Sequence, residues 1–258
     1  MLEETEITRA IITDAVEEFL NSLEVDVVIG GGGPSGIVAA RYLSDAGLSV
    51  ALFEKKLSIG GGMWGGGMLY PRIVVQDDAK FILEQAGVRL KRWQDSDNYT
   101  ANSIESVVKL TASAIDAGAR IFNGITIEDV MVRQHSITGV VINSSAVMAA
   151  GLHVDPLSVA SKFVIDATGH PLEICRVVES KGCRLRTKSG KIEGERPMWA
   201  QRAEELVVEN TREIYPGLYV CGMAANAAYG APRMGPVFGG MLRSGKRAAE
   251  LIAERIEG

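Results

Sequence analysis

The sequence predicts an α/β fold with a Rossmann-like dinucleotide-binding core. A short apolar run rich in valine and isoleucine, residues 25–29, enters a glycine cluster at 30–33. Helical spacing of apolar side chains resumes at 37–43, and a second apolar run at 48–53 ends on Glu54. Strand, glycine turn, helix and strand in this order make a βαβ unit, in which the two strands lie parallel.

Composition and charge exclude several other classes of protein. The chain has 258 residues, of which 47% are hydrophobic, and this is enough for a sizeable core. Its net charge of −5 argues against binding to nucleic acid or to an anionic membrane surface. The acidic segment 1–10 lacks the basic and apolar regions of a signal peptide, and no apolar run is long enough to span a bilayer. We therefore expect a cytoplasmic protein.

The first element is an amphipathic helix over residues 4–22. Its apolar side chains recur at three- and four-residue spacings, at Ile7, Ile11, Ile12, Val16, Phe19, Leu20 and Leu23. We expect this helix to pack on the core of its own chain, and a contact with another subunit is the alternative.

Beyond the βαβ unit, the glycine-rich stretch 60–67 predicts an irregular loop where the backbone approaches another group closely. Helical patterns follow at 77–86 and 103–117. Two runs rich in valine and isoleucine, 121–133 and 137–143, predict antiparallel strands.

The last third of the chain contains two more apolar runs, which predict strands at 161–167 and 218–221. Residues 240–255 are rich in alanine, leucine, lysine and glutamate and predict a closing helix. The polar stretch 176–200 predicts no regular element. Because no repeat or linker divides the chain, we expect its elements to interleave in one domain.

The strongest functional motif is Gly31-x-Gly33-x-x-Gly36, which lies between a predicted strand and a predicted helix. Glycines there permit a tight turn and a close approach to a pyrophosphate, and the helix N-terminus offers free N–H groups. Glu54 ends the next strand, where an acid accepts hydrogen bonds from a ribose diol. It favours an unphosphorylated ribose, although the lysines at 55–56 leave the 2′-phosphate form open. A purely structural glycine turn is the alternative.

The order of segments also resembles the glutathione-reductase-like (FAD/NAD-binding) superfamily. The segments are VVIGGGGPSG, ALFEKK, VIDATG and GLYVCG. In that superfamily a Gly-Asp pair after the late strand usually holds the ribityl chain of a flavin. This chain has Gly222-Met223 there, so we expect the adenosine diphosphate half of the site without FAD.

Two of the three histidines fall in short polar segments, HVDP at 153–156 and ATGH at 167–170. On an extended segment His153 and Asp155 point to the same side, because side chains alternate. Together with His170 they make a set of imidazoles and a carboxylate that suits a labile divalent metal such as Fe(II). The spacing equally allows His170 a capping or hydrogen-bonding role in the core.

Over nearly its whole length the chain resembles the thiamine thiazole synthase family. The resemblance is carried by GGGGPSG, by FEKK with the GGGMWGGGM loop, by HVDP and TGH, and above all by GAPRMGPVFGGM at 230–241. It implies that NAD is a consumed substrate. Nicotinamide is lost, the ADP-ribose condenses with free glycine, and added sulfur gives an ADP-thiazole, the adenylated thiazole carboxylate.

The resemblance also implies roles for individual residues. Arg233 pairs with the carboxylate of the substrate glycine, a task that suits a planar guanidinium. Asp155 and His170 are iron ligands, with His153 as a possible third, in a site between protomers of a homo-octamer. Dinucleotide contacts fall on Gly31, Gly33, Ser35, Gly36, Glu54, Lys55, Gly62, Ile127, His153, Val154, Asp155 and Met223.

The source of sulfur depends on position 153. Relatives that sacrifice a cysteine sulfur in a single turnover carry that cysteine where this chain has His153. The histidine implies the archaeal sulfide-dependent type, in which free sulfide is the donor and the enzyme turns over repeatedly. The three cysteines, Cys175, Cys183 and Cys221, lack C-x-x-C spacing and lie elsewhere, so we expect buried or idle thiols.

Three rival functions stay open at this point. They are an FAD-dependent oxidoreductase, a ribose-phosphate isomerase and a non-catalytic NAD-binding protein. All of them fit one α/β domain over residues 1–258. Its predicted parts are a leading helix at 1–22, the dinucleotide fingerprint at 23–60, antiparallel strands at 121–143, a metal-site segment at 144–175, and a C-terminal strand, substrate loop and helix at 216–258.

Overall fold

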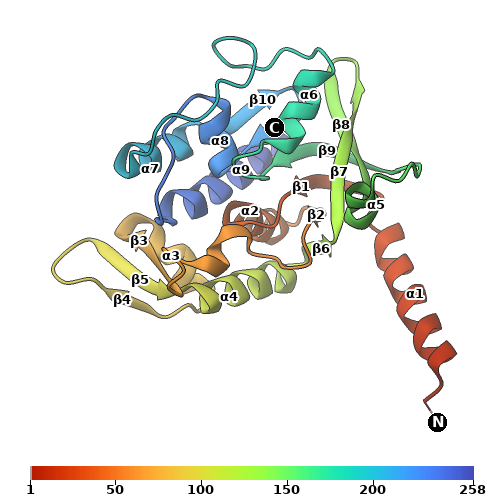
Figure 1. Ribbon diagram of the computed structural model, residues 1–258, viewed down its shortest axis with the longest axis horizontal. Coiled ribbons are helices and arrows are strands. Elements are labelled where there is room, and N and C mark those ends of the chain that lie inside the picture. Colours follow the sequence, from red (N-terminus) through yellow and green to blue (C-terminus); the bar gives the residue numbers. More distant parts are fainter. Residues whose placement is uncertain (1) are drawn as a thin grey trace.

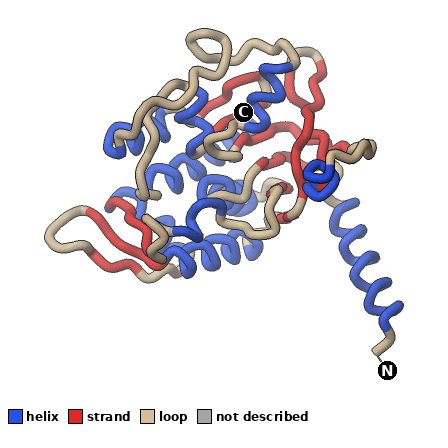
Figure 2. Tube along the Cα trace, viewed as in Figure 1, coloured by secondary structure: helices blue, strands red, loops and turns tan. Residues whose placement is uncertain are grey.

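The structure is a computed structural model that describes residues 2–258 (Figures 1 and 2). The helices are α1 (Glu4–Leu20), α2 (Pro34–Asp45), η1 (a 3-10 helix, Gly61–Gly65), α3 (Asp77–Gln85), α4 (Ser103–Asp116), α5 (Ser145–Ala150), α6 (Glu173–Ser180), α7 (Ala200–Glu209), α8 (Met223–Ala228) and α9 (Gly239–Glu257). The strands are β1 (Glu24–Gly30), β2 (Val50–Glu54), β3 (Arg72–Gln76), β4 (Leu90–Arg92), β5 (Asn98–Asn102), β6 (Arg120–Asn123), β7 (Ile125–Arg133), β8 (Ser136–Ser144), β9 (Leu157–Asp166), β10 (Arg212–Tyr215) and β11 (Leu218–Val220). Within this range no helix has both the length and the apolar character needed to cross a membrane.

The main sheet confirms the predicted α/β core. Its strands run in the order β10-β11-β9-β1-β2-β6, and β1 pairs in parallel with both β2 and β9. The strand β11 is parallel to β9, and β6 is parallel to β2. The carboxyl ends of β1, β2 and β9 therefore meet at one edge, where ligands bind in open α/β sheets.

Both faces of the main sheet are covered. Val27 and Ile29 of β1 pack with α2, α3, α4 and α9 on one face. Val28 points to the other face and packs with the β7–β8 hairpin, α6 and α8. Strand alternation thus divides the core into two layers, and burial on both sides explains why β1 and β2 are continuous apolar runs.

One predicted strand is wrong. The run 121–133 is not a single antiparallel strand, because Gly124 adopts a left-handed conformation (φ +70°) and splits it. The first piece, β6, is parallel to β2, and the second, β7, is antiparallel to β8. The amide of Gly124 donates to the carbonyl of Lys56, which ties the break to the end of β2. Valine and isoleucine content on both sides of the glycine hides this change of partner.

Several helices and strands lie where the sequence predicted no regular element, and one strand is longer than predicted. The strands β3, β5 and β4 form a separate antiparallel sheet, which stands apart from the main sheet in Figure 2. Part of the polar stretch 176–200 is helical, since α6 runs to Ser180. The helices α7 and α8 and the strand β10 were also missed, and β9 begins at Leu157 because it pairs with β8 as well as with β1.

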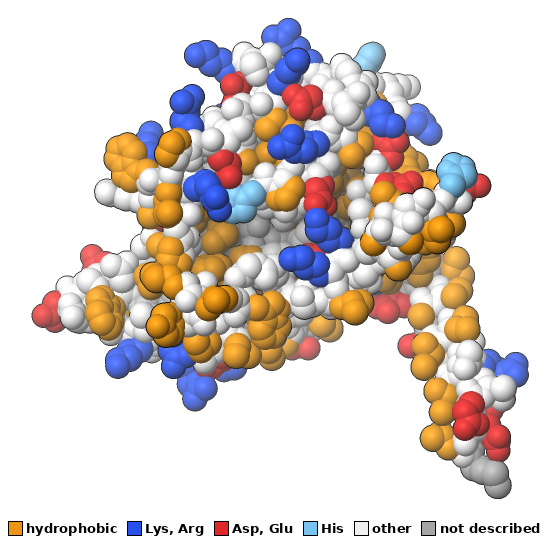
Figure 3. Space-filling view, in the orientation of Figure 1, with side chains coloured by type: hydrophobic (Ala, Val, Ile, Leu, Met, Phe, Trp, Pro, Cys, Tyr) orange, Lys and Arg blue, Asp and Glu red, His pale blue; other side chains and the backbone are white. Residues whose placement is uncertain are grey.

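The expectation that the leading helix packs on its own core is wrong. The helix α1 projects away from the body of the molecule (Figure 1), and none of its residues is buried. Only its last turn is attached, where the ring of Phe19 meets the ring of Phe122 edge-on at 5.8 Å between centroids. The apolar stripe of α1 is left without a partner in the single chain, as the hydrophobic side chains along it in Figure 3 show.

Candidate functional site

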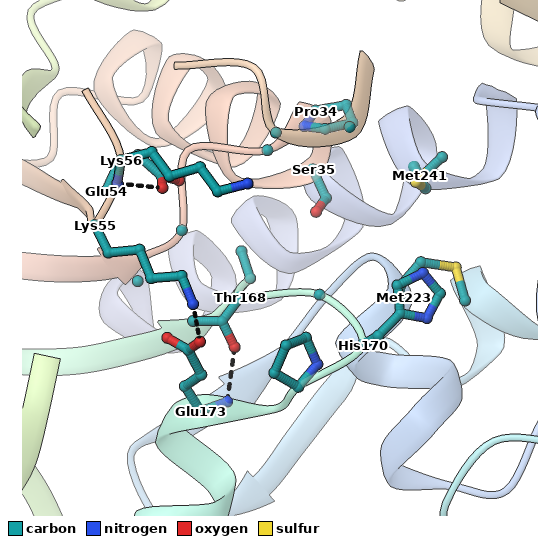
Figure 4. Close-up of a pocket in the computed structure, with 18 of the residues that line it drawn as sticks. Pro34, Ser35, Glu54, Lys55, Lys56, Thr168, His170, Glu173, Met223 and Met241 are labelled. Atoms are coloured by element: carbon teal, nitrogen blue, oxygen red, sulfur yellow. Dashed lines mark hydrogen bonds and ion pairs between the residues drawn. The ribbon is translucent and has the colours of Figure 1, made fainter. Parts of the chain in front are cut away.

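A cavity of about 560 Å³ lies at the carboxyl ends of β1, β2 and β9 (Figure 4). It brings together segments that are far apart in the chain, from the glycine turn after β1 to the loop before α9. Ten of the residues singled out from the sequence line it: Gly31, Gly33, Ser35, Glu54, Lys55, Gly62, Ile127, His170, Met223 and Arg233.

The glycine turn is held by close contacts that leave no room for side chains. A Cβ on Gly36 would lie 2.1 Å from the carbonyl oxygen of Gly31, and one on Gly31 would lie 2.5 Å from the carbonyl oxygen of Ala167. At Gly33 the space around a Cβ is open. Gly33 is also the N-cap of α2, so the first N–H groups of this helix face the cavity with no capping side chain. A helix N-terminus of this kind binds an anion such as a pyrophosphate.

The carboxylate of Glu54 is fixed at the end of β2. Its Oε2 accepts from the amide of Gly32 at 2.8 Å, and its Oε1 accepts from the amide of Lys56 at 2.9 Å. The side chain is buried at the cavity wall. Each carboxylate oxygen can accept a further hydrogen bond, so Glu54 retains the capacity to receive a ribose hydroxyl.

The turn between β9 and α6 is built around Asp166, to which the sequence analysis assigned no role although it lies in the VIDATG segment. Its carboxylate accepts from the hydroxyl of Thr168 at 2.6 Å and from the amide of Cys175 at 2.9 Å. Complete burial raises the pKa of Asp166. The hydroxyl of Thr168 in turn accepts from the amide of Glu173, so this turn is held rigidly beside the glycine loop.

Lys55 does not stand free in the cavity. It forms an ion pair with Glu173 at the start of α6 (Figure 4). Glu173 lines the same cavity, and no local sequence motif marks it. Glu173 therefore compensates the charge of Lys55, whereas Lys56 lines the same cavity.

Two contacts at the cavity join three polar side chains, with Glu195 in the middle between His170 and Arg233. The Nδ1 atom of His170 lies 2.5 Å from Oε1 of Glu195, and the Nε atom of Arg233 lies 3.9 Å from Oε2 of the same carboxylate. The side chain of His170 is 45% exposed, so it is not a core histidine. Glu195 comes from the polar stretch 176–200, which carries no motif, so the sequence did not indicate it.

The segment with His153, Val154 and Asp155 lies apart from this cavity. All three residues are exposed, on the loop between α5 and β9, and none of them lines the cavity. The amide side chain of Asn143 donates to the carbonyl of Val154 at 3.1 Å and anchors the loop. Among residues 2–258, no group of three histidine, cysteine or acidic side chains is placed to hold a metal ion within one chain.

Apolar side chains also line the cavity. Ile127 of β7 and Met223 at the start of α8 are both buried, and Met241 of α9 lines the cavity as well. Gly222, which precedes Met223, has a left-handed conformation (φ +63°), and a Cβ on it would lie 2.3 Å from the hydroxyl of Ser35. The carboxylate that flavoproteins place after the late strand is thus replaced by a thioether, which accepts hydrogen bonds only weakly.

The cysteines stand outside this site. Cys175 and Cys221 are fully buried, and burial raises the pKa of Cys175 well above its ordinary value and that of Cys221 to about 12. Cys183 is partly buried. None of the three cysteines, all of which the structure describes, lines the cavity. The two buried thiols stay protonated at neutral pH.

The glycine turn, the open N-terminus of α2 and the buried acid that ends β2 define a Rossmann-like α/β fold of the kind that binds dinucleotides in other proteins. Comparison with known proteins then places the chain more narrowly. It belongs to the Thi4 family, whose model matches residues 8–238. This confirms the family that the sequence motifs indicated.

Relatives of known name match along the whole chain. A thiamine thiazole synthase of Methanothermobacter thermautotrophicus is 56% identical over 257 residues, which is 99% of each chain. One from Pyrococcus horikoshii is 48% identical over 257 residues, which covers both chains completely.

Solved structures confirm the fold class. The crystal structure of THI4 from Thermovibrio ammonificans superposes with a TM-score of 0.97 at 46% identity, over the full length of both chains. A geranylgeranyl bacteriochlorophyll reductase-like protein from Thermoplasma acidophilum reaches a TM-score of 0.56 at 17% identity, over 91% of this chain and 79% of its own, and shares the fold alone.

Proposed function

We propose that this protein is a thiamine thiazole synthase that makes an ADP-thiazole from NAD, free glycine and free sulfide, with Fe(II). The observation that carries the proposal is one cavity lined by two groups of residues. The glycine turn, the N-terminus of α2 and Glu54, which we call the dinucleotide cradle, lie at one side, and His170 and Arg233 lie at another. The names of the full-length relatives support the synthesis of a thiamine thiazole.

In this proposal NAD binds as a substrate. Its pyrophosphate lies at the N-terminus of α2. The hydroxyls of the adenosine ribose donate hydrogen bonds to Glu54, and the adenine packs against Ile127. The lack of a carboxylate at Met223 disfavours a flavin in the same cavity. Loss of nicotinamide then leaves the opened ribose near Met223 and His170, where carbonyl condensation with an amine can follow.

Arg233 is suited to bind the substrate glycine. Its side chain is 58% exposed, and its 3.9 Å approach to Glu195 is too long for a strong hydrogen bond. The guanidinium therefore keeps donors for a second carboxylate, which it can bind in two parallel hydrogen bonds. A glycine held by its carboxylate presents its amino group to the ribose carbonyl.

The carboxylate beside His170 supports a role for this histidine as an iron ligand. Histidines that ligate a metal through one ring nitrogen commonly donate the other N–H to a carboxylate, as the Nδ1 contact with Glu195 allows. We expect Asp155, with His153 as the candidate third ligand, to come from a neighbouring protomer, since these residues lie on an exposed loop of their own chain. Bound Fe(II) would act as a Lewis acid that favours deprotonated sulfide beside the substrate.

Free sulfide as the sulfur source is supported by the state of the cysteines. The position of the sacrificial cysteine holds His153. Cys175 and Cys221 are buried thiols with raised pKa values, so neither is a reactive thiolate. An enzyme that consumes none of its own atoms turns over repeatedly.

The test is an anaerobic incubation of the purified protein with NAD, glycine, Fe(II) and sulfide, followed by mass spectrometry. We expect more ADP-thiazole than enzyme, and none when sulfide is omitted. Product without sulfide, together with conversion of one cysteine to dehydroalanine, would refute the sulfide donor. Flavin absorbance in the purified protein would favour an oxidoreductase. NAD binding with no release of nicotinamide would favour a non-catalytic protein.

A further inference from the structure

The carboxylate of Glu195 lies between the two side chains to which the proposed reaction assigns its small substrates. Its Oε1 is 2.5 Å from Nδ1 of His170, and its Oε2 is 3.9 Å from Nε of Arg233. The side chain of Glu195 is 18% exposed, against 45% for His170 and 58% for Arg233. The least exposed member of this chain of groups is therefore the one in the middle.

Backbone pairing holds Glu195 in this place. Residue 196 forms a parallel bridge with Pro232. The amide of Arg196 donates to the carbonyl of Ala231 at 3.0 Å, and the amide of Arg233 donates to the carbonyl of Arg196 at 3.1 Å. The segment that carries Glu195 is thus joined by its main chain to the loop that carries Arg233.

The contact with His170 has a definite consequence for its ring. A carboxylate accepts hydrogen bonds, so the neutral imidazole donates Nδ1–H to Glu195 and leaves Nε2 as the acceptor. A neutral histidine side chain without a hydrogen-bond acceptor at Nδ1 has nothing to hold the proton on that nitrogen. The Nε2 lone pair is the one that a metal ion or a substrate proton needs.

The contact with Arg233 acts through charge. At 3.9 Å it is a loose ion pair, which orients the guanidinium while its terminal N–H groups remain available for a substrate carboxylate. One glutamate thus faces both the proposed metal-binding imidazole and the proposed glycine-binding guanidinium.

We propose that Glu195 is a positioning residue that selects the Nδ1–H tautomer of His170 and orients Arg233, so that the metal and glycine sites form together. This inference rests on the proposed function for the identity of the ligands. The contacts that it uses can be measured without that function.

The decisive variant is Glu195→Gln, which keeps the shape of the side chain and removes its charge. The first readout is magic-angle-spinning NMR of protein labelled with [¹⁵N]histidine, at a pH where the ring is neutral. The chain has three histidines, so loss of a signal in His170→Asn assigns the ring. We expect His170 to be the Nδ1–H tautomer in the wild type. Glu195→Gln should weaken this preference, because a glutamine amide can donate to Nδ1 as well as accept from it.

The second readout is binding and kinetics. We expect Glu195→Gln to raise the apparent Kd for Co(II), used as a probe of the iron site, about 10- to 100-fold. The KM for glycine should rise about two- to fivefold, as expected when an exposed ion pair is lost. The Kd for NAD should not change, since the dinucleotide cradle at Glu54 does not contact Glu195. Glu205→Gln, which removes an exposed carboxylate on α7, is the matched control.

The conservative variant Glu195→Asp separates positioning from a general structural role. It keeps the charge, so it should restore part of the tautomer preference and part of the glycine affinity. An unchanged tautomer and an unchanged KM for glycine in Glu195→Gln would overturn the inference. If the tautomer changes but the wild type forms no ADP-thiazole, the positioning role of Glu195 stands and the proposed function fails.

Discussion

At the scale of single residues, the glycine turn shows that similar residues in one motif do different work. Gly31 and Gly36 are needed because their Cβ atoms would collide with main-chain carbonyls. Gly33 differs, because a Cβ there would meet no atom of the protein within 4 Å and its open side faces the cavity. If the proposed pyrophosphate binds there, folding and ligand binding make separate demands on one short segment.

These two demands can be separated by a pair of variants. Gly36→Ala should lower the free energy of unfolding by about 3 kcal/mol, since its Cβ would lie 2.1 Å from a carbonyl oxygen. Gly33→Ala should leave stability nearly unchanged and weaken NAD binding, because its methyl group enters the space of the pyrophosphate. Urea denaturation and NAD titration check this pair. Equal losses of stability in both variants would contradict the argument.

Glu204 on α7 is a buried acid that the proposed reaction does not use. Its Oε2 accepts from the amide of Gly240, in the first turn of α9, at 2.5 Å. Burial raises the pKa of Glu204 from 4.5 to about 7, while hydrogen bonds from Gly240 and Gln76 lower it in part. Glu204 thus attaches α7 to the helix that follows the Arg233 loop.

The raised pKa of Glu204 predicts a pH-dependent stability. Below pH 4.5 the folded and unfolded chains both hold the proton. Between pH 4.5 and about 7 the unfolded chain releases it first, so the free energy of unfolding falls with pH, by about 3 kcal/mol in total. Glu204→Gln should remove this fall, measured as the difference from the wild type in urea denaturation at pH 5 and pH 8. The exposed Glu205→Gln serves as control, and it should track the wild type.

At the scale of elements, α1 is the part of the chain whose role a single protomer does not explain. Its apolar residues Ile11 and Ile12 are 63% and 57% exposed. A helix of this length that contacts the body only through its last turn has little tertiary packing to stabilise it. A second protomer that covers the stripe would supply this packing and fits the homo-oligomer that the family resemblance implies.

A charge placed in the stripe tests this role of α1. Val16→Lys should reduce the mass of the particle in light scattering, while circular dichroism still shows a folded chain. Ala10→Lys is the matched control, since Ala10 is exposed on the opposite side of the helix. If Val16→Lys and the wild type have the same mass, α1 is not a subunit contact.

At the scale of the whole molecule, the proposed metal ligands are divided between two regions. His170 lines the cavity, whereas Asp155 lies on the exposed α5–β9 loop. Under the proposed function, a complete site would need the loop of another protomer to reach the cavity. Assembly and catalysis would then be coupled.

Complementation between two inactive variants tests the shared site. Asp155→Ala and His170→Ala should each abolish sulfur incorporation on its own. When the two are mixed and refolded together, about a quarter of the sites in random oligomers recover both residues, so activity should return. No recovery, in oligomers shown by mass spectrometry to be mixed, would place both residues of a site in one chain or outside it.

The sequence by itself determined the βαβ unit that forms the proposed dinucleotide cradle. Apolar runs, the glycine spacing and Glu54 are local signals, and a βαβ unit is made of neighbours in the chain. The prediction therefore placed β1, α2 and β2 correctly, and the long closing helix as well. The motifs also indicated the family, because they are specific strings of adjacent residues.

Only the tertiary structure decided the features that depend on distant pairings. Gly124 divides one apolar run between a parallel and an antiparallel partner, and no local pattern distinguishes these. Glu195 meets His170 and Arg233 because residue 196 pairs with Pro232 across a gap of many residues. Burial is a property of the whole fold. It raises the pKa of Glu204, and its absence along α1 leaves the apolar stripe of that helix exposed. A sequence shows which groups are present, and the fold decides which of them meet.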